Sequence, residues 1–210
     1  MPASGGGRWV EVDPERLERW LVGFVERHGA YAASGAGDEI VLRATDGETA
    51  RVYPPPGTGP AADLAELVTN AQAPRRIGLM LVRRGGYAVG VAAGTDLIVS
   101  KVDSRYVQSR TAAGGWSQQR FARRRDNQAK AMTGEVAGVV ARLLLPEAGR
   151  LDAVVAGGDR RLVDEVLTDA RLAPLRPLVA ERFLAVPDPK LVVLQAAVKA
   201  ARTVRIRLPR

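Results

Sequence analysis

The sequence predicts an α/β fold with a mixed β-sheet that contains an antiparallel meander, together with a small N-terminal α+β module. Three strand-like runs follow one another closely from residue 77, and such close spacing indicates a meander. A long helical pattern comes next, and short strands then alternate with helices, as in α/β domains. A proline- and glycine-rich stretch at 54–60 interrupts the chain before this part. We therefore predict two domains, residues 1–72 and 73–210.

The N-terminal module is expected to contain a helix, a hairpin and a second helix. Apolar residues recur at helical spacing after Asp13, which is suited to cap a helix, and Gly29 is suited to end it. The runs 39–44 and 48–53 alternate around an Asp-Gly pair, which predicts a hairpin. A short helix is predicted at 61–71, after the prolines.

The second domain is expected to begin with the meander and to continue with alternating helices and strands. The meander comprises the runs 77–83, 87–92 and 96–107, which glycine-containing turns divide. A helix is predicted through 129–143 from the spacing of its apolar residues, and Pro146 ends it. The later elements are predicted as a strand at 151–156, a helix at 159–170, a strand at 183–186, a helix at 189–201 and an edge strand at 203–208.

The composition indicates a globular protein that binds an acidic partner. The formal net charge is +8, and 27 of the 31 basic residues are arginine, which suits bidentate contacts with nucleic-acid phosphates. The chain has no cysteine and a single histidine, His28, so thiol chemistry is excluded and neither a metal nor another cofactor is expected. No apolar run approaches the roughly 20 residues of a membrane span, and the N-terminus lacks a signal-peptide core. We therefore expect a cytoplasmic protein without a membrane partner.

Arginines cluster around a glycine pair in the middle of the chain. The stretch 114–125 reads GGWSQQRFARRR, and no acidic residue lies between Ser104 and Asp126. A solvated face normally includes carboxylates that limit self-repulsion, so this segment is predicted to face phosphates. A GC-rich genome also raises the ratio of arginine to lysine, which makes that ratio weaker evidence than the clustering. The arginines predicted to bind RNA are Arg105, Arg110, Arg120, Arg123, Arg124 and Arg125.

The glycine pair and the glutamine after it predict a chemical role for this loop. Gly114 and Gly115 permit positive φ and a close approach to another molecule. Gln118 can present its amide to an ester carbonyl and a water, and so position and polarise both without titrating. Glutamine is no general base, so the substrate must manage the proton, as the ribose hydroxyl beside the ester of peptidyl-tRNA could. The alternative is a plain loop in which Ser117 caps the following helix.

The run GGWSQQR, followed by FARRRDNQAKA, resembles the loop of the VLRF group of release-factor-like ribosome rescue proteins, most closely its actinobacterial branch. The resemblance covers about residues 76–186 and does not explain the N-terminal module. It implies the ribonuclease-H-like fold of the middle domain of archaeal and eukaryotic release factors, whose Gly-Gly-Gln loop enters the peptidyl transferase centre. Gly114 and Gly115 match the family's glycines and Gln118 its glutamine, with Gln119 beside it. A Trp-Ser pair separates them, which departs from a direct Gly-Gly-Gln geometry.

The resemblance implies hydrolysis of the ester of peptidyl-tRNA, with the large ribosomal subunit, peptidyl-tRNA and rRNA as partners. Eukaryotic relatives imply a competing reaction at the same place, cleavage of the tRNA 3′-CCA end. Two other functions stay open, an RNA- or ribosome-binding protein without catalysis and a magnesium-dependent nuclease. The carboxylates considered for the nuclease, by position alone, are Asp96, Asp103, Asp126 and Asp152.

Overall fold

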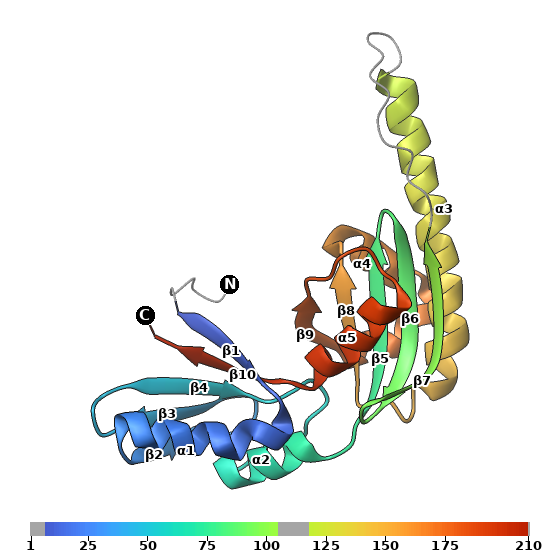
Figure 1. Cartoon of the computed structure of the whole chain (residues 1–210). Helices are drawn as coiled ribbons and strands as arrows, with labels where there is room; N and C mark the ends of the chain where they lie inside the picture. Colours follow the sequence, from blue (N-terminus) through green and yellow to red (C-terminus); the bar gives the residue numbers. More distant parts are fainter. Residues whose placement is uncertain (1–6, 105–117, 210) are drawn as a thin grey trace. The chain divides into compact units, whose positions relative to one another are not determined.

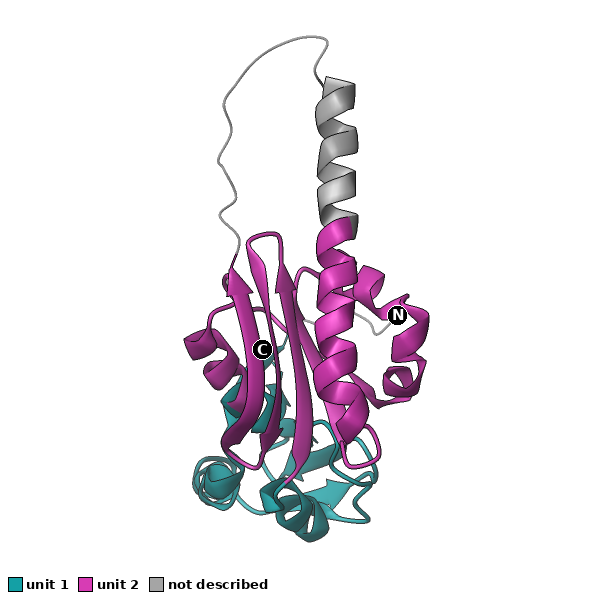
Figure 2. Ribbon diagram, turned by 90° about the vertical axis from the view of Figure 1, so that its right-hand side faces the viewer, with its two compact units in different colours: residues 1–74, 199–210 teal, residues 75–198 magenta. Residues whose placement is uncertain are grey.

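The structure is a computed structural model that describes residues 7–104 and 118–209, without the side chains of residues 118–130. Contacts between Cα atoms divide the chain into two compact units, residues 1–74 with 199–210, and residues 75–198 (Figure 2). The C-terminal segment thus groups with the N-terminal residues, whereas the sequence predicted one boundary between residues 72 and 73. None of the helices in the described part of the chain is long and apolar enough to cross a membrane.

The first unit is a five-stranded antiparallel sheet with two helices (Figure 1). Its elements are β1 (Arg8–Val12), the 3-10 helix η1 (Pro14–Arg16), α1 (Leu17–His28), β2 (Tyr31–Ser34), β3 (Ile40–Ala44), β4 (Thr49–Tyr53), α2 (Leu64–Gln72) and β10 (Val204–Leu208). The strand order is β1-β10-β4-β3-β2. The prediction of β10 as an edge strand is therefore wrong, because β10 pairs with both β1 and β4.

Alternating side chains of this sheet build its core. Val52 lies opposite Ile206 on one neighbouring strand and opposite Ile40 on the other, and all three are buried. They belong to one hydrophobic cluster with Phe24 of α1 and Leu67 of α2. Because successive side chains of a strand point to opposite sides, the residues between them lie on the other side of the sheet. We call the side that packs on the helices the inner face and the opposite side the outer face.

The helix and hairpin predicted in this unit are confirmed, with one change at the helix start. Gly29 ends α1 with a φ of 81°, and its N–H donates to the carbonyl of Val25. Gly47 turns the chain between β3 and β4 with a φ of 92°. The Asp13 side chain makes no capping hydrogen bond, because the chain first forms η1 and enters α1 only at Leu17.

The second unit is a mixed five-stranded sheet between helices. Its elements are β5 (Arg76–Arg83), β6 (Gly86–Ala93), β7 (Asp96–Ser104), α3 (Gln118–Leu144), η2 (Leu145–Glu147), β8 (Ala153–Gly158), α4 (Arg160–Leu167), η3 (Ala170–Leu178), β9 (Val179–Leu184) and α5 (Leu191–Arg202), within which the unit boundary falls. The strands β5, β6 and β7 form the predicted antiparallel meander, and β8 and β9 run parallel to β5. The strand order of this sheet is β7-β6-β5-β8-β9. The predicted α/β fold class is confirmed.

Helices cover both faces of this second sheet, with α3 on one side and α5 on the other (Figure 1). A side chain at Gly78 of β5 would meet Leu144 of α3, whereas one at Gly90 of β6 would meet Leu194 of α5. Strands covered on both faces read as continuous apolar runs, and residues 77–82 of β5 are all buried. This packing fixes the sheet as the support from which the central loop departs.

The connection after α4 makes stability depend on pH in the acid range. Asp169 accepts hydrogen bonds from the backbone N–H and the guanidinium of Arg171 at 2.7–3.0 Å. The side-chain bond, then the backbone bond, lowers the pKa of Asp169 from 3.8 to about 2. Because the folded pKa is the lower one, the stabilisation is complete above the unfolded value and is lost as pH falls through about 2. We expect the stability difference between the wild type and Asp169→Asn to be largest near neutral pH, to shrink as pH falls below about 4, and to be mostly lost by pH about 2.

Chemical denaturation across that pH range measures the difference, and a carboxyl NMR titration reads the group directly. The matched variant Arg171→Gln should raise the pKa of Asp169 toward its ordinary value. A stability difference that persists unchanged down to pH about 2 would contradict the role of the ionised pair.

Candidate functional site

The candidate site is built where the central loop joins the second sheet. Residues 105–117, within which the sequence predicts a loop, follow Ser104, the last residue of β7, and precede Gln118, the first residue of α3. Four predicted site residues, Gly114, Gly115, Arg105 and Arg110, lie outside the described residues. The other predicted residues belong to the first turns of α3, and their side chains also lie outside the description: Gln118, Arg120, Arg123, Arg124 and Arg125.

The helix α3 is much longer than the predicted segment 129–143, because it begins at Gln118 and spans 27 residues. At 1.5 Å per residue it is about 40 Å long. Among the described side chains of α3, burial begins with Met132, about 20 Å along the axis from Gln118. Apolar periodicity therefore identified only the packed half of the helix, since periodicity reports burial and the first turns carry mainly arginine and glutamine.

Two hydrogen bonds fix the packed half of α3 near the place where the helix meets the sheet. The hydroxyl of Tyr87 on β6 donates to Glu135 Oε1 at 3.1 Å. The hydroxyl of Thr133 donates to Glu165 Oε1 of α4 at 3.2 Å. Tyr87 and Thr133 are buried, so these bonds form inside the packed layer and set the rotation of α3. We call these four residues the α3 anchor; the sequence contained no motif that identifies it.

We expect Tyr87→Phe to loosen the α3 anchor while the aromatic packing is kept. Loss of one hydrogen bond to a partly buried carboxylate side chain should lower the free energy of unfolding by about 1–3 kcal/mol. Denaturant unfolding of the variant measures the loss. Tyr31→Phe, on β2 of the first unit, is the matched control, and equal stability of Tyr87→Phe and the wild type would contradict the anchor.

Basic residues surround the edge of the sheet at which the loop departs. Ser104 pairs with Gly86, and Val82 pairs with Gly158, so the turn after β5 and the start of α4 lie at this same edge. We define the basic edge as the arginines Arg83, Arg84, Arg160 and Arg161. Arg83 and Arg84 are adjacent in the sequence, whereas the contribution of α4 follows only from the parallel pairing of β8 with β5.

The contacts of the basic edge hold two of its arginines in place. Arg83 donates to the carbonyl of Val186 at 2.8 Å and lies 3.4 Å from Asp188. The guanidinium of Arg160 lies 4.2 Å from the centre of the Phe183 ring. Arg160 and Arg161 occupy the first turn of α4, where the helix dipole disfavours cations. Such a locally unfavourable placement is typical of a functional surface.

Asp159 and Gly158 determine the local geometry at the start of α4. Asp159 accepts a hydrogen bond from the N–H of Leu162, so it is the N-cap of α4. Gly158 has a φ of 99°, and a side chain there would lie 2.2 Å from the carbonyl oxygen of Val82. The glycine is thus explained by close strand packing.

The carboxylates considered for a magnesium site do not converge where the structure describes them. Asp96 and Asp103 stand at opposite ends of β7, about 23 Å apart at the rise of a strand. Asp152 accepts from the backbone N–H of Arg76, at the opposite end of β5 from Arg83. The described residues contain no group of three metal-ligating side chains; the side chain of Asp126 lies outside the description.

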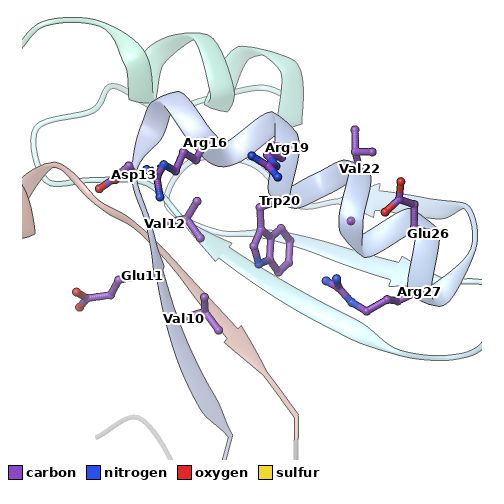
Figure 3. A pocket seen from close by; sticks show the side chains of 11 residues that line it. Val10, Glu11, Val12, Asp13, Arg16, Arg19, Trp20, Val22, Glu26 and Arg27 are labelled. Atoms are coloured by element: carbon purple, nitrogen blue, oxygen red, sulfur yellow. Dashed lines mark ion pairs between the residues drawn. The ribbon is translucent and has the colours of Figure 1, made fainter.

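A groove of about 620 Å³ opens in the first unit between β1 and α1 (Figure 3). Its apolar lining includes Val10, Val12 and Trp20. Its charged lining is balanced, with the arginines Arg16, Arg19 and Arg27 and the acids Glu11, Asp13 and Glu26. The groove therefore offers no selective attraction for an anion.

The whole second unit, together with part of the C-terminal segment of the first unit, matches a known family. Residues 75–207 match the family model described as "Actinobacteria/chloroflexi VLRF1 release factor". This match spans the basic edge, α3 and the loop between β7 and α3. None of the curated proteins compared with the sequence matches it.

Three solved structures are similar to the chain at low sequence identity. An "Archaeal protein" matches over 74% of this chain and 48% of its own chain, with 17% identity and a TM-score of 0.39. The archaeal translation termination factor aRF1 matches over 94% of this chain and 66% of its own chain, with 16% identity and a TM-score of 0.48. The Vms1 mitochondrial localization core matches over 91% of this chain and 80% of its own chain, with 11% identity and a TM-score of 0.48. The chain thus spans about half of the first structure's length and about two thirds of the second's.

Proposed function

This chain belongs to the Actinobacteria/chloroflexi VLRF1 release factor family, and from that premise we propose that it releases nascent chains by hydrolysing the ester of peptidyl-tRNA on the large ribosomal subunit. The observation that carries the proposal is the long helix α3, which begins at Gln118 directly after the glycine-containing loop. A helix anchored at one end and about 40 Å long suits a narrow and deep target. Because the proposed substrate is bound to the ribosome, we expect the protein to act in the cytoplasm.

The proposed reaction needs water, a positioned carbonyl and a leaving ribose oxygen. Gly114 and Gly115 give the loop its reach, and the Gln118 amide positions water against the ester carbonyl. The water oxygen forms a new bond to the acyl carbon, and the bond from that carbon to the ribose oxygen breaks. The neighbouring ribose hydroxyl relays the proton, so the products are the free peptide acid and tRNA with an intact 3′ end. Gln119 is the neighbouring candidate for the same role.

The arginines bring the loop to this substrate in the proposal. Arg120, Arg123 and Arg124 follow Gln118 within α3 and would contact phosphates of rRNA or of the tRNA acceptor end. Arg105, Arg110 and Arg125 extend the same positive segment. The basic edge, at the end of the sheet where the chain leaves β7 toward α3, supports this assignment, because its arginines continue the positive charge onto the folded domain.

The tRNA 3′ end after reaction tests the reaction type. Purified large subunits that carry peptidyl-tRNA are incubated with the full chain, and the released tRNA is tested for charging with a fresh amino acid. We expect tRNA that can be charged directly, together with a free peptide. A shortened tRNA that first needs repair by a CCA-adding enzyme would support cleavage of the 3′-CCA end. If neither a free peptide nor a shortened tRNA forms, the result would support binding without catalysis.

A further inference from the structure

The first unit carries a second charged surface, which the proposed reaction does not use. On the outer face of its sheet, two aromatic side chains lie among arginines in the register of the strands. Trp9 of β1 is opposite Arg207 of β10, and Arg205 of β10 is opposite Tyr53 of β4. We call this surface the aromatic–arginine face; its members are Trp9, Tyr53, Arg43, Arg51, Arg205 and Arg207.

Trp9 is held in place but remains open to a ligand. Its ring lies 5.4 Å from the Tyr53 ring, and the guanidinium of Arg205 lies 4.5 Å from its centre. The guanidinium of Arg207 lies 5.9 Å away. The side chain nevertheless keeps 45% of its surface exposed, which is unusual for tryptophan. A planar ligand can therefore stack there without first ordering the ring.

The net charge of this face is positive. Its four arginines are opposed by two acids, Glu11 and Glu39. Glu39 accepts from Arg51 at 2.6 Å and from the Tyr53 hydroxyl at 2.9 Å. Burial by itself would raise the pKa of Glu39, but these hydrogen bonds outweigh it and hold that pKa below its ordinary value. Glu39 is therefore ionised at neutral pH and limits the positive charge without cancelling it.

We propose that the aromatic–arginine face binds single-stranded RNA. Unpaired bases stack on exposed aromatic rings and guanidinium planes, and arginines placed between the rings contact the phosphates. An antiparallel sheet presents both kinds of group in rows, whereas the groove of Figure 3 in the same unit has balanced charge. The inference does not depend on the proposed reaction, because the first unit holds none of the residues assigned to catalysis.

Binding of a short, labelled, single-stranded RNA to the full chain tests this proposal by fluorescence anisotropy. Loss of one stacking platform in Trp9→Ala should weaken binding about tenfold. Arg43→Glu should also weaken binding, whereas Glu39→Gln should strengthen it, because it removes an opposing charge. Ultraviolet cross-linking followed by mass spectrometry should place the RNA at Trp9 or Tyr53.

Arg19→Glu is the matched control, since it makes the same change of charge as Arg43→Glu within the groove of the same unit. Thermal unfolding verifies that each variant is folded. Equal affinity of Arg43→Glu and Arg19→Glu together with unchanged affinity of Trp9→Ala would overturn the proposal. So would binding that requires anionic lipid vesicles rather than RNA. Loss of peptide release in Gln118→Ala with intact RNA binding would agree with an RNA-binding face that is independent of the reaction. The two proposals can therefore be refuted separately.

Discussion

We expect Gln118→Ala to release peptide from subunit-bound peptidyl-tRNA about 10²–10³-fold more slowly than the wild type at saturating protein. The effect is large because the amide is proposed to position water and polarise the carbonyl, two contributions that matter in the transition state. Subunit binding should stay unchanged, since no positive charge is removed. Single-turnover release and a separate binding assay on the same subunits measure the two quantities.

Gln119→Ala is the matched control, because it removes the same side chain from the adjacent residue of α3. Its release rate should remain near that of the wild type. If Gln119→Ala is inactive and Gln118→Ala is active, the catalytic role belongs to Gln119. If both variants release peptide at the wild-type rate, glutamine has no part in the reaction and the proposed mechanism is wrong.

Local signals in the sequence predicted most of the second unit. The meander was readable because glycine-containing turns separate runs that are buried on both faces, as residues 77–82 are. The strand β8 and the helix α4 that follows it were likewise predicted, since both depend on neighbouring residues. The first sheet was less readable. Its strand β1 pairs with β10 from the other end of the chain, and no local pattern reports a partner so distant.

Part of the candidate site could likewise be predicted from neighbouring residues in the sequence, and part depends on residues that only the fold brings together. The loop and its arginines are contiguous in sequence, so they could be named as candidates from the sequence alone. The α3 anchor and the Arg160 side of the basic edge depend on how α3 and α4 pack on the sheet, which only the fold specifies. The aromatic–arginine face likewise joins β1, β10 and β4, whose residues 9, 53 and 207 are far apart in the chain.

The anchor and the arginines have separate consequences for the proposed reaction. The α3 anchor holds the helix at Tyr87 and Thr133. A small tilt of the helix axis there becomes a larger displacement at Gln118, because displacement grows with distance from the anchor. A displacement of about 1 Å at a reacting group can cost about a hundredfold in rate. The arginines of α3 act earlier, because attraction to phosphates governs whether the loop arrives at all.

The triple variant Arg120→Ala, Arg123→Ala and Arg124→Ala should therefore weaken binding to the large subunit by about a thousandfold or more, at about 1.5–3 kcal/mol for each charged hydrogen bond. Release at saturating protein should change little, which distinguishes this variant from Gln118→Ala. The slope of log affinity against log salt should become shallower by about two to three, because each lost phosphate contact removes roughly 0.7–0.9 from it. Subunit co-sedimentation over a range of salt concentrations measures both.

The balanced groove of the first unit supplies a control that removes the same charge elsewhere: Arg16→Ala, Arg19→Ala and Arg27→Ala together. If net charge alone governed binding, the two triple variants would lose the same affinity and the same salt dependence. We expect the control to bind nearly as the wild type does, because its arginines are matched by Glu11, Asp13 and Glu26. A specific loss in the α3 variant would then assign the interaction with RNA to α3, whereas equal losses would reduce it to non-specific attraction.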